Sequence, residues 1–128
     1  MKKTFYQLCK YKDETYLHEV KGTIRPLPLG DGMINIGFDN ERTLWNATIV
    51  ENGLNITTKY HETLKAAIAA VTTTLSFYPE LREMEAFQNA KKEYDRLILN
   101  EVVDKFKYVE ADTAEGEKNE KQRIYHTF

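Results

Sequence analysis

The sequence predicts an α+β domain in which an antiparallel sheet of about five strands is covered by two C-terminal helices, the second of them long. Three observations predict it: alternating apolar residues in the first half, an Asn-Gly pair between two such stretches, and apolar residues three and four apart in the second half. At 128 residues the chain suits a single domain, which we place at residues 1–109, followed by a flexible, charged tail at 110–128.

The segment 43–71 is the part around which the predicted fold is organised. Asn52 and Gly53 both tolerate the positive φ values that a type I′ turn requires. Such a turn places Ile49 opposite Ile56 and gathers the apolar side chains of the two flanking strands on one face. A shift of one residue would turn that face to solvent, so we expect the register to be strongly held.

The first half of the chain is predicted to be a meander. Alternating apolar and polar residues indicate strands, and clusters of Gly, Asp and charged residues indicate the turns between them. Pro26 and Pro28 lack a backbone donor, which confines that stretch to a sheet edge or an extended connection. Strands are expected at residues 4–11, 15–25, 33–38 and on both sides of the Asn-Gly turn, with turns at 12–14 and 30–32 and a loop at 39–42.

The cover for the sheet is predicted to be helical. From Glu62 to about Phe77, apolar residues recur three and four apart, as one helical stripe requires. The run 72–74 consists of three threonines, which are poor helix formers, so this helix should weaken toward its end. The stripe consists of Leu64, Ala67, Ile68, Val71 and Leu75.

A second, long helix is predicted to begin at Pro79 and to run to about residue 109. An apolar stripe continues through it for about eight turns, and its length of roughly 40 Å exceeds that of the sheet. Its far half therefore needs another surface, which a second copy of the chain could supply through Ile98, Val102 and Phe106. The alternative is a kink near Asn100 that folds the chain back.

The compartment is indicated by cysteine usage and by the apolar runs. Cys9 is the single cysteine, so no disulfide can form within the chain, and an isolated cysteine favours a reducing compartment. Gln7 and Lys10 interrupt the continuous apolar stretch that a signal peptide would need. No run approaches the roughly 20 apolar residues of a membrane span. A cytoplasmic protein is therefore expected.

Few residues are spaced for catalysis or for a cofactor. No His or Cys pair has the spacing of a metal site, so neither a metal nor another cofactor is expected. A small enzyme could use Cys9 as a nucleophile if His18 lies beside it across the first hairpin. A buried thiol packed beside a strand histidine explains the same two residues without catalysis, and we expect a protein that is not an enzyme.

Basic residues are too scattered to indicate nucleic-acid binding. The net charge is −2, with a mild basic excess in the first 30 residues. Binding to phosphates normally needs a clustered basic face. A nucleic-acid-binding accessory protein stays open as an alternative in which Lys10, Lys12 and Lys21 make the contact.

Aromatic residues are the unusual feature of the composition, with eight Tyr, six Phe and one Trp. Alternation in the first two strands places aromatic side chains on both faces, so some of them should stay exposed. Tyr combines apolar area with a polar tip and suits protein recognition. The expected protein-binding residues are aromatics of the first hairpin and charges at the start of the long helix, namely Phe5, Tyr6, Tyr11, Tyr16, Glu80 and Glu83.

Three short motifs carry a family resemblance over about a quarter of the chain. They are Trp45-x-Ala-Thr, Asn52-Gly53-Leu54, and Thr63-Leu64 leading to Ala67-Ile68. In these the chain resembles the small α+β accessory proteins of Gram-positive phages and plasmids, among them anti-CRISPR and other anti-defence inhibitors. The resemblance implies a non-enzymatic protein that occludes a host protein. It carries over no functional residue, because such inhibitors share no signature.

Overall fold

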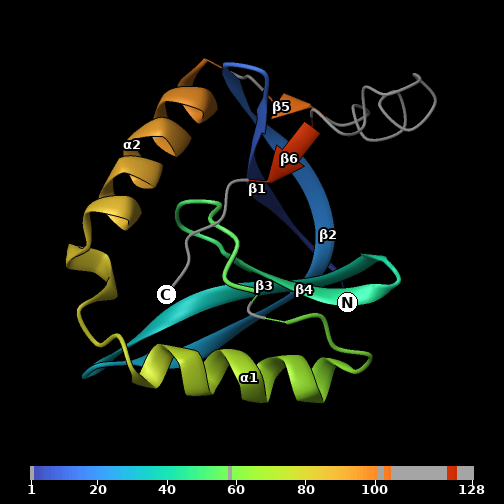
Figure 1. Ribbon diagram of the computed structural model, residues 1–128, viewed down its shortest axis with the longest axis vertical. Coiled ribbons are helices and arrows are strands. Elements are labelled where there is room, and N and C mark those ends of the chain that lie inside the picture. Colours follow the sequence, from blue (N-terminus) through green and yellow to red (C-terminus); the bar gives the residue numbers. More distant parts are fainter. Residues whose placement is uncertain (1, 58, 101–102, 105–120, 124–128) are drawn as a thin grey trace.

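The computed structural model describes residues 2–57, 59–100, 103–104 and 121–123 and has an α+β fold (Figure 1). Its centre is a four-stranded antiparallel meander, to which two short C-terminal strands are added. The strands of the meander are β1 (Lys3–Tyr11), β2 (Glu14–Leu29), β3 (Gly32–Arg42) and β4 (Leu44–Ile49). The remaining elements are helix α1 (Leu64–Ser76), the 3₁₀ helix η1 (Leu81–Glu83), helix α2 (Glu85–Leu99), β5 (Val103–Asp104) and β6 (Lys121–Arg123).

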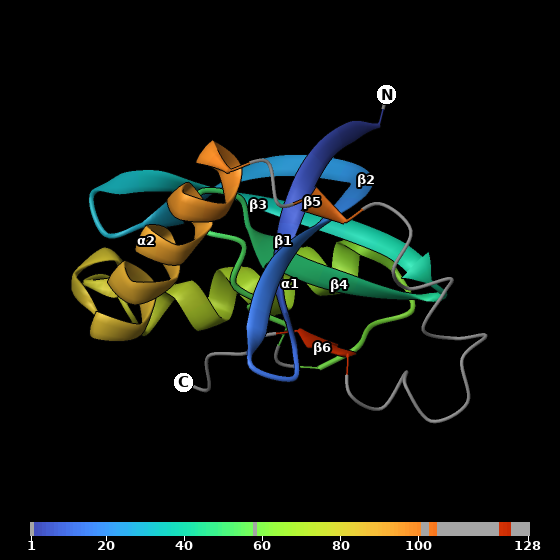
Figure 2. The ribbon, with the colours of Figure 1, turned by 90° about the horizontal axis from the view of Figure 1, so that it is seen from above.

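Strand β2 is shared between the two halves of the sheet. Its residues Glu14–Gly22 pair with β1, and its residues Thr23–Leu29 pair with β3. Between the two stretches the strand curves, so that β1 crosses the direction of β3 and β4 (Figures 1 and 2). The first half of the sheet is therefore folded over the second half.

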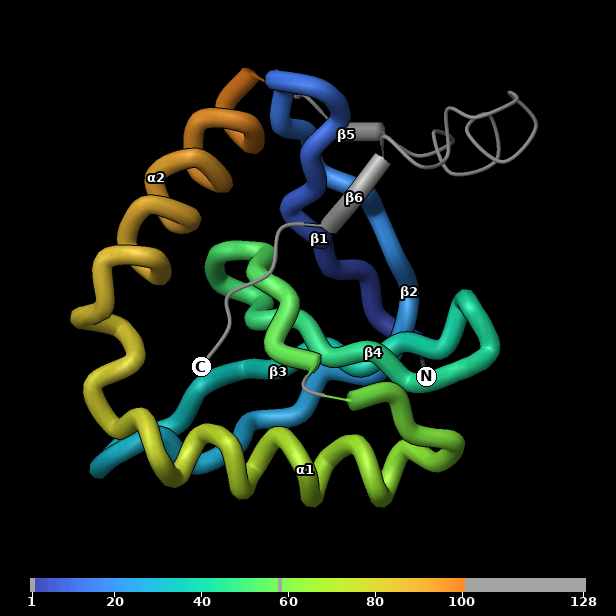
Figure 3. Tube along the Cα trace, viewed as in Figure 1, coloured from blue at the N-terminus to red at the C-terminus, as the bar shows by residue number. Residues whose placement is uncertain are grey.

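One face of the sheet and both helices enclose the main core. The strand pairing places Leu27 beside Ile34 and Phe38 beside Ala47 on this face, which confirms that apolar residues alternate along the strands. Helix α1 packs against β2 and β4, and α2 runs from the end of α1 to the β1–β2 turn (Figure 3). The buried members of the core are Leu8, Leu17, Leu27, Leu29, Ile34, Ile36, Phe38, Ala47, Ile49, Leu54, Ile56, Ala67, Val71, Leu75, Leu81, Phe87, Ala90 and Leu97.

Helix α1 agrees with its predicted position and buried face. It begins after Thr63, whose hydroxyl accepts a hydrogen bond from the Ala66 amide at 3.1 Å. The threonine run 72–74 does not end the helix. Each of its hydroxyls donates to the carbonyl four residues earlier, on Ile68, Ala69 and Ala70, at 2.7 to 3.1 Å, and so finds a partner within the helix.

The free edge of β2 contains both prolines, as the sequence predicts. Pro26 lies opposite Asn35 and Pro28 opposite Met33, in the stretch of β2 that pairs with β3 alone among the described residues. A proline offers no amide hydrogen to an incoming strand, so this edge is a poor template for strand addition.

The type I′ turn predicted at Asn52 and Gly53 is wrong. Only Gly53 has a positive φ, of 75°, whereas a type I′ turn needs two such residues. The Gly53 amide donates to the Ile49 carbonyl, and the Ile49 amide donates to the Leu54 carbonyl, both at 2.8 Å. The reversal is thus a four-residue turn, 50–53, in which Asn52 is completely buried.

The predicted fifth strand of the meander is replaced by an irregular segment. Beyond the turn, the described residues pair with β4 through isolated bridges of Thr48 with Asn55 and Trp45 with His61. The Thr57 hydroxyl accepts from the Ala47 amide at 2.6 Å and donates to the Ala47 carbonyl at 3.2 Å. The Thr57 side chain thus makes the hydrogen bonds that the backbone of a paired strand would make. A pattern of apolar residues cannot reveal this substitution.

The loop predicted at 39–42 belongs to β3. This strand continues to Arg42, and the chain reverses at Thr43, which has a φ of 81°. The ladder is irregular between Asp39 and Arg42, so the register with β4 changes there.

The long helix predicted from Pro79 to about residue 109 is wrong in its length. Met84 has an extended backbone (φ −72°, ψ 142°) and separates η1 from α2. Helix α2 ends at Leu99, where the Asn100 amide donates to the Arg96 carbonyl at 3.1 Å. The chain then folds back, because β5 pairs with β2 in parallel, as the alternative of a kink near Asn100 predicts.

The residues predicted to form a dimer contact do not lie on one continuous helix among the described residues. Ile98 is on α2 and is 41% exposed, whereas Val102 and Phe106 lie outside the described residues. The predicted tail 110–128 also lies outside them, apart from Lys121–Arg123, which form β6 and pair with β1 at Cys9–Tyr11. Among the described helices none is long and apolar enough to cross a membrane.

Candidate functional site

The first candidate surface is formed where the β2–β3 turn meets the segment between α1 and α2. Gly30, in the turn, has a φ of 58°, and a Cβ built on it would lie 3.3 Å from the Pro79 carbonyl oxygen. The views agree that this turn lies beside the end of α1 (Figures 1 and 2). The backbone of two distant segments is thus in contact here, and we call this surface the acidic corner, defined by Asp31, Met33, Phe77, Glu80 and Glu83.

An arginine holds the acidic corner together. The Arg82 guanidinium donates to Glu51 through Nε at 3.1 Å and through Nη2 at 2.9 Å, and Nη2 also donates to the Met33 carbonyl at 2.9 Å. The side chain therefore ties η1 to the 50–53 turn and to β3. A two-pronged arginine–carboxylate contact fixes geometry as well as charge.

A hollow of about 340 Å³ opens at the acidic corner. Arg82 is the one cation that lines it, and its charge is balanced by Glu51. Two large apolar side chains of this surface are exposed: Met33 at 53% and Phe77 at 71%. The lining consists of Leu29, Gly30, Asp31, Pro79, Glu80, Arg82 and Glu83. The corner therefore combines exposed apolar area with three carboxylates.

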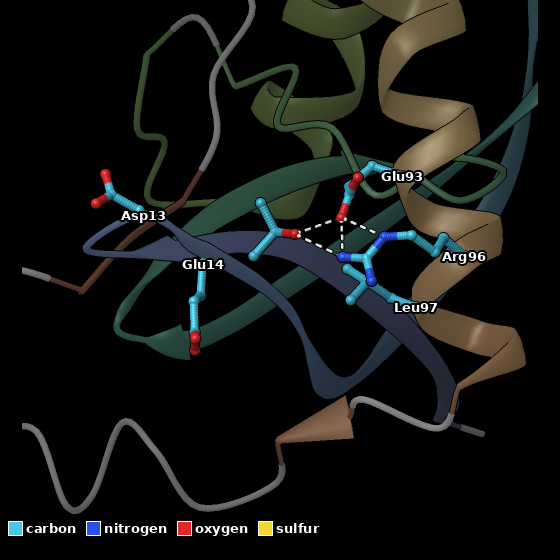
Figure 4. A pocket seen from close by; sticks show the side chains of 6 residues that line it. Asp13, Glu14, Glu93, Arg96 and Leu97 are labelled. Atoms are coloured by element: carbon cyan, nitrogen blue, oxygen red, sulfur yellow. Dashed lines mark hydrogen bonds and ion pairs between the residues drawn. The ribbon is translucent and has the colours of Figure 1, made fainter.

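A second pocket, of about 520 Å³, lies between the β1–β2 turn and α2 (Figure 4). Its side chains form one hydrogen-bonded group, in which the Thr15 hydroxyl donates to Glu93 Oε1 at 2.6 Å and Arg96 donates to the same oxygen, through Nε at 3.0 Å. Asp13 and Glu14 also line this pocket and add two carboxylates to it. These bonds attach α2 to the first hairpin, which explains the group as a structural contact.

The Glu93 carboxylate should stabilise the fold only while it is ionised. Hydrogen bonds from Arg96 first, and then from Thr15, hold the pKa of Glu93 below its ordinary value of 4.5. A lowered pKa gives stability that is present above the unfolded pKa and is lost as pH falls through the folded one. We expect Glu93→Gln to lower the free energy of unfolding by about 0.5–1 kcal/mol at pH 7, because the pair is partly exposed. Urea unfolding at pH 7 and at pH 3 measures it.

The matched control for Glu93 is Glu14→Gln, an exposed carboxylate of the same pocket. It should change the unfolding free energy by less than about 0.5 kcal/mol at either pH. A loss in Glu93→Gln that stays the same at pH 3 would contradict the role of its charge.

Two of the predicted binding residues are buried. Phe5 is 2% and Tyr16 8% exposed, so the expectation that these side chains lie on the surface is wrong. The reason is the folded sheet: a Cβ on Gly37 of β3 would lie 2.6 Å from the Phe5 ring, so this ring packs directly over β3. Tyr6 packs against the core and Tyr11 is half-buried, and Lys12 Nζ lies 5.4 Å from the Tyr11 ring centre.

The two remaining predicted binding residues, Glu80 and Glu83, are both exposed and meet at the acidic corner. The sequence places them near the start of a helix, and the structure brings Asp31 beside them. Met33 and Phe77 were not predicted to be exposed. One sequence signal could have drawn attention to the surface around Phe77. The stretch 66–79 carries no charged residue, which is unusual in a chain with 30% charged residues.

Cys9 and His18 are close but do not lie directly opposite one another. Cys9 pairs with Tyr16 and His18 with Gln7, so the two residues are diagonal neighbours on the same face of the hairpin. Cys9 is completely buried, and its sulfur lies 3.6 Å from the Gln7 carbonyl oxygen. His18 is also buried, with Nε2 3.9 Å from Glu41 Oε1. Neither side chain therefore lies on the surface.

A buried polar group lies on that same face and was not predicted. Gln7 Nε2 donates to Asp39 Oδ1 at 3.0 Å and lies 3.5 Å from Thr48 Oγ1, and all three residues are buried. The contact joins β1 to β3 and β4. It therefore helps to hold the folded sheet together.

The lysines considered for nucleic-acid binding do not form one patch. Lys10 lies opposite Thr15, whereas Lys21 lies opposite Thr4, so the two are at different ends of the hairpin. The Lys21 amide donates to the Glu41 carboxylate at 3.0 Å, which brings negative charge to that end. Within the described part of the chain, no group of three or more His, Cys, Asp or Glu side chains could hold a metal ion.

Comparisons of the chain with protein-family models, with curated proteins and with solved structures found no match.

Proposed function

We propose that this protein is a non-enzymatic accessory or inhibitor protein that binds another protein by stoichiometric contact at the acidic corner. The observation that supports it is a hollow with a carboxylate rim, formed by segments that also carry two exposed apolar side chains. These are Met33, whose backbone carbonyl accepts from Arg82, and Phe77, two residues before Pro79. Apolar area surrounded by polar groups is typical of protein interaction surfaces. The family resemblance extends the proposal to a phage or plasmid protein of the anti-CRISPR kind, which occludes a host defence or nucleic-acid-processing protein.

The rigidity of the acidic corner favours binding. Arg82 contacts both Glu51 and the Met33 backbone, so three segments are held in place before a partner arrives. Gly30 packs against Pro79 on the other side of the hollow. A preformed surface loses little conformational entropy on association, which leaves more of the contact energy for affinity.

Capture of the partner tests the proposal. N-terminally tagged protein is incubated with a bacterial lysate, with and without nuclease, and proteins retained in high salt are identified. We expect one protein to be retained by the wild type and by Leu99→Ser, and to be lost with Phe77→Ser and Met33→Ser. Leu99 is the matched control, because it is an apolar side chain 82% exposed at the far end of α2.

The other outcomes contradict the proposal. If Phe77→Ser retains the partner as well as the wild type does, the acidic corner is not the contact surface. If nuclease removes all retained material, the nucleic-acid alternative with Lys10, Lys12 and Lys21 replaces it. If the native protein is alkylated rapidly at Cys9 at neutral pH, the thiol is accessible and the enzymatic alternative gains support.

A further inference from the structure

We infer that the segment recognised by the acidic corner is basic, a Lys- or Arg-rich stretch of a partner protein that also carries an apolar side chain. The inference rests on the proposed function and names the chemistry of the partner. It follows from the charges that surround the hollow and from the exposed apolar side chains of Met33 and Phe77, which belong to the segments that form it.

The charges at the hollow that are not engaged by Arg82 are negative. Asp31, Glu80 and Glu83 are exposed, and none of them is hydrogen-bonded through its side chain to a described cation. The cation of the lining, Arg82, is engaged by Glu51 and by the Met33 carbonyl. Three carboxylates are therefore available to a partner, and opposite charge on that partner would raise the association rate and exclude acidic competitors.

The apolar side chains set a second requirement. Phe77 and Met33 offer area that a purely hydrophilic polycation would leave in water. An apolar side chain of the partner can cover this area, and a lysine or arginine beside it can approach the Phe77 ring face. A segment that alternates cationic and apolar residues satisfies both features.

Helix α1 extends the same surface away from the hollow. Its exposed residues Ala66, Ala69 and Thr73 precede Phe77 by eleven, eight and four positions, so they share one helical strip. No charged residue occurs between Lys65 and Glu80. A basic segment that lies along α1 therefore meets no charged side chain between Lys65, which repels it, and the carboxylates of the acidic corner, which attract it.

A synthetic peptide tests the inference directly. The probe is a fluorescein-labelled 14-residue peptide of lysine and leucine, with leucines three and four apart, and binding is followed by fluorescence anisotropy at low and at high salt. We expect affinity for the wild type that falls with salt, and affinity reduced by about tenfold in Glu80→Lys/Glu83→Lys. Phe77→Ser should weaken binding at both salt concentrations.

The matched control is Asp13→Lys/Glu14→Lys, which changes the net charge by the same amount at the other acidic pocket. It should change the affinity by less than about twofold, because rim charges act locally at high salt. Equal weakening by both double variants would show attraction to net charge alone and would overturn the inference. Thermal unfolding of each variant confirms that it is folded.

Failure of this inference can be told apart from failure of the proposed function. If the lysate partner is lost with Phe77→Ser but is retained by Glu80→Lys/Glu83→Lys, the acidic corner binds a protein and the basic segment is wrong. If neither the peptide nor the lysate partner responds to Phe77→Ser, both fail.

Discussion

Gly22→Ala is expected to lower the free energy of unfolding by about 3 kcal/mol or more, because it places a methyl group inside the backbone of a neighbouring strand. A Cβ built on Gly22 would clash with the Phe38 carbonyl oxygen and lie 3.2 Å from the Asp39 Cα. These atoms belong to the β3 backbone and cannot move as a side chain would. The clash occurs where β2 leaves β1 and joins β3, so relief would separate the two halves of the sheet. Denaturant unfolding followed by circular dichroism measures the loss.

Gly32→Ala is the matched control for this substitution. A Cβ on Gly32 would have its nearest neighbour, the Leu29 carbonyl oxygen, at 4.0 Å, which is an ordinary contact. The change should therefore stay within about 0.5 kcal/mol. A Gly22→Ala protein as stable as Gly32→Ala would mean that β2 and β3 do not approach one another as described.

The elements that depend on local periodicity could be predicted from the sequence. The apolar stripe of α1 needs only its own residues, because spacings of three and four define a helical face wherever the helix packs. Alternation likewise assigned Leu17 to one face of β2, and Tyr16 and Val20 to the other. The prolines predicted the position of the free edge, since a residue without an amide hydrogen is confined to an edge in any sheet.

What alternation could not predict is that the sheet folds over itself. In a flat sheet with one covered face, Phe5 and Tyr16 would lie on the open side. Here β3 and β4 lie against that side of the first hairpin, as the contact of Phe5 with Gly37 shows. The decisive residue is Gly22, a single glycine within a strand. A glycine is needed there because the backbone closely approaches Phe38 and Asp39, which are distant in the sequence.

The helix boundaries and the acidic corner were missed for related reasons. An apolar stripe continues from Leu81 to Leu97 because both residues face the same core, although the backbone is extended at Met84 between them. Residues that face one core are apolar whether or not the helix that carries them is continuous, so the pattern does not reveal the break. The acidic corner joins Asp31 to Glu80 and Glu83, about fifty residues apart, and no local pattern reports such a contact.

Asn52→Ala is expected to lower the free energy of unfolding by about 2–3 kcal/mol. The side chain is completely buried, its Oδ1 accepts from the Leu54 amide at 3.1 Å, and its Nδ2 donates to the Phe87 carbonyl at 3.3 Å. Alanine would remove both bonds and leave an amide and a carbonyl buried without these partners. Calorimetry or denaturant unfolding measures the change.

Asn35→Ala provides the control, because Asn35 is exposed on β3. This substitution should lower the free energy of unfolding by less than about 0.5 kcal/mol. The effect of Asn52 should also reach the acidic corner. Asn52 fixes the 50–53 turn to α2, and the adjacent Glu51 holds Arg82, so a loosened turn should weaken partner capture before the protein unfolds. An Asn52→Ala protein that loses stability but captures the partner with unchanged affinity would show that the acidic corner is held by η1 and the β2–β3 turn alone.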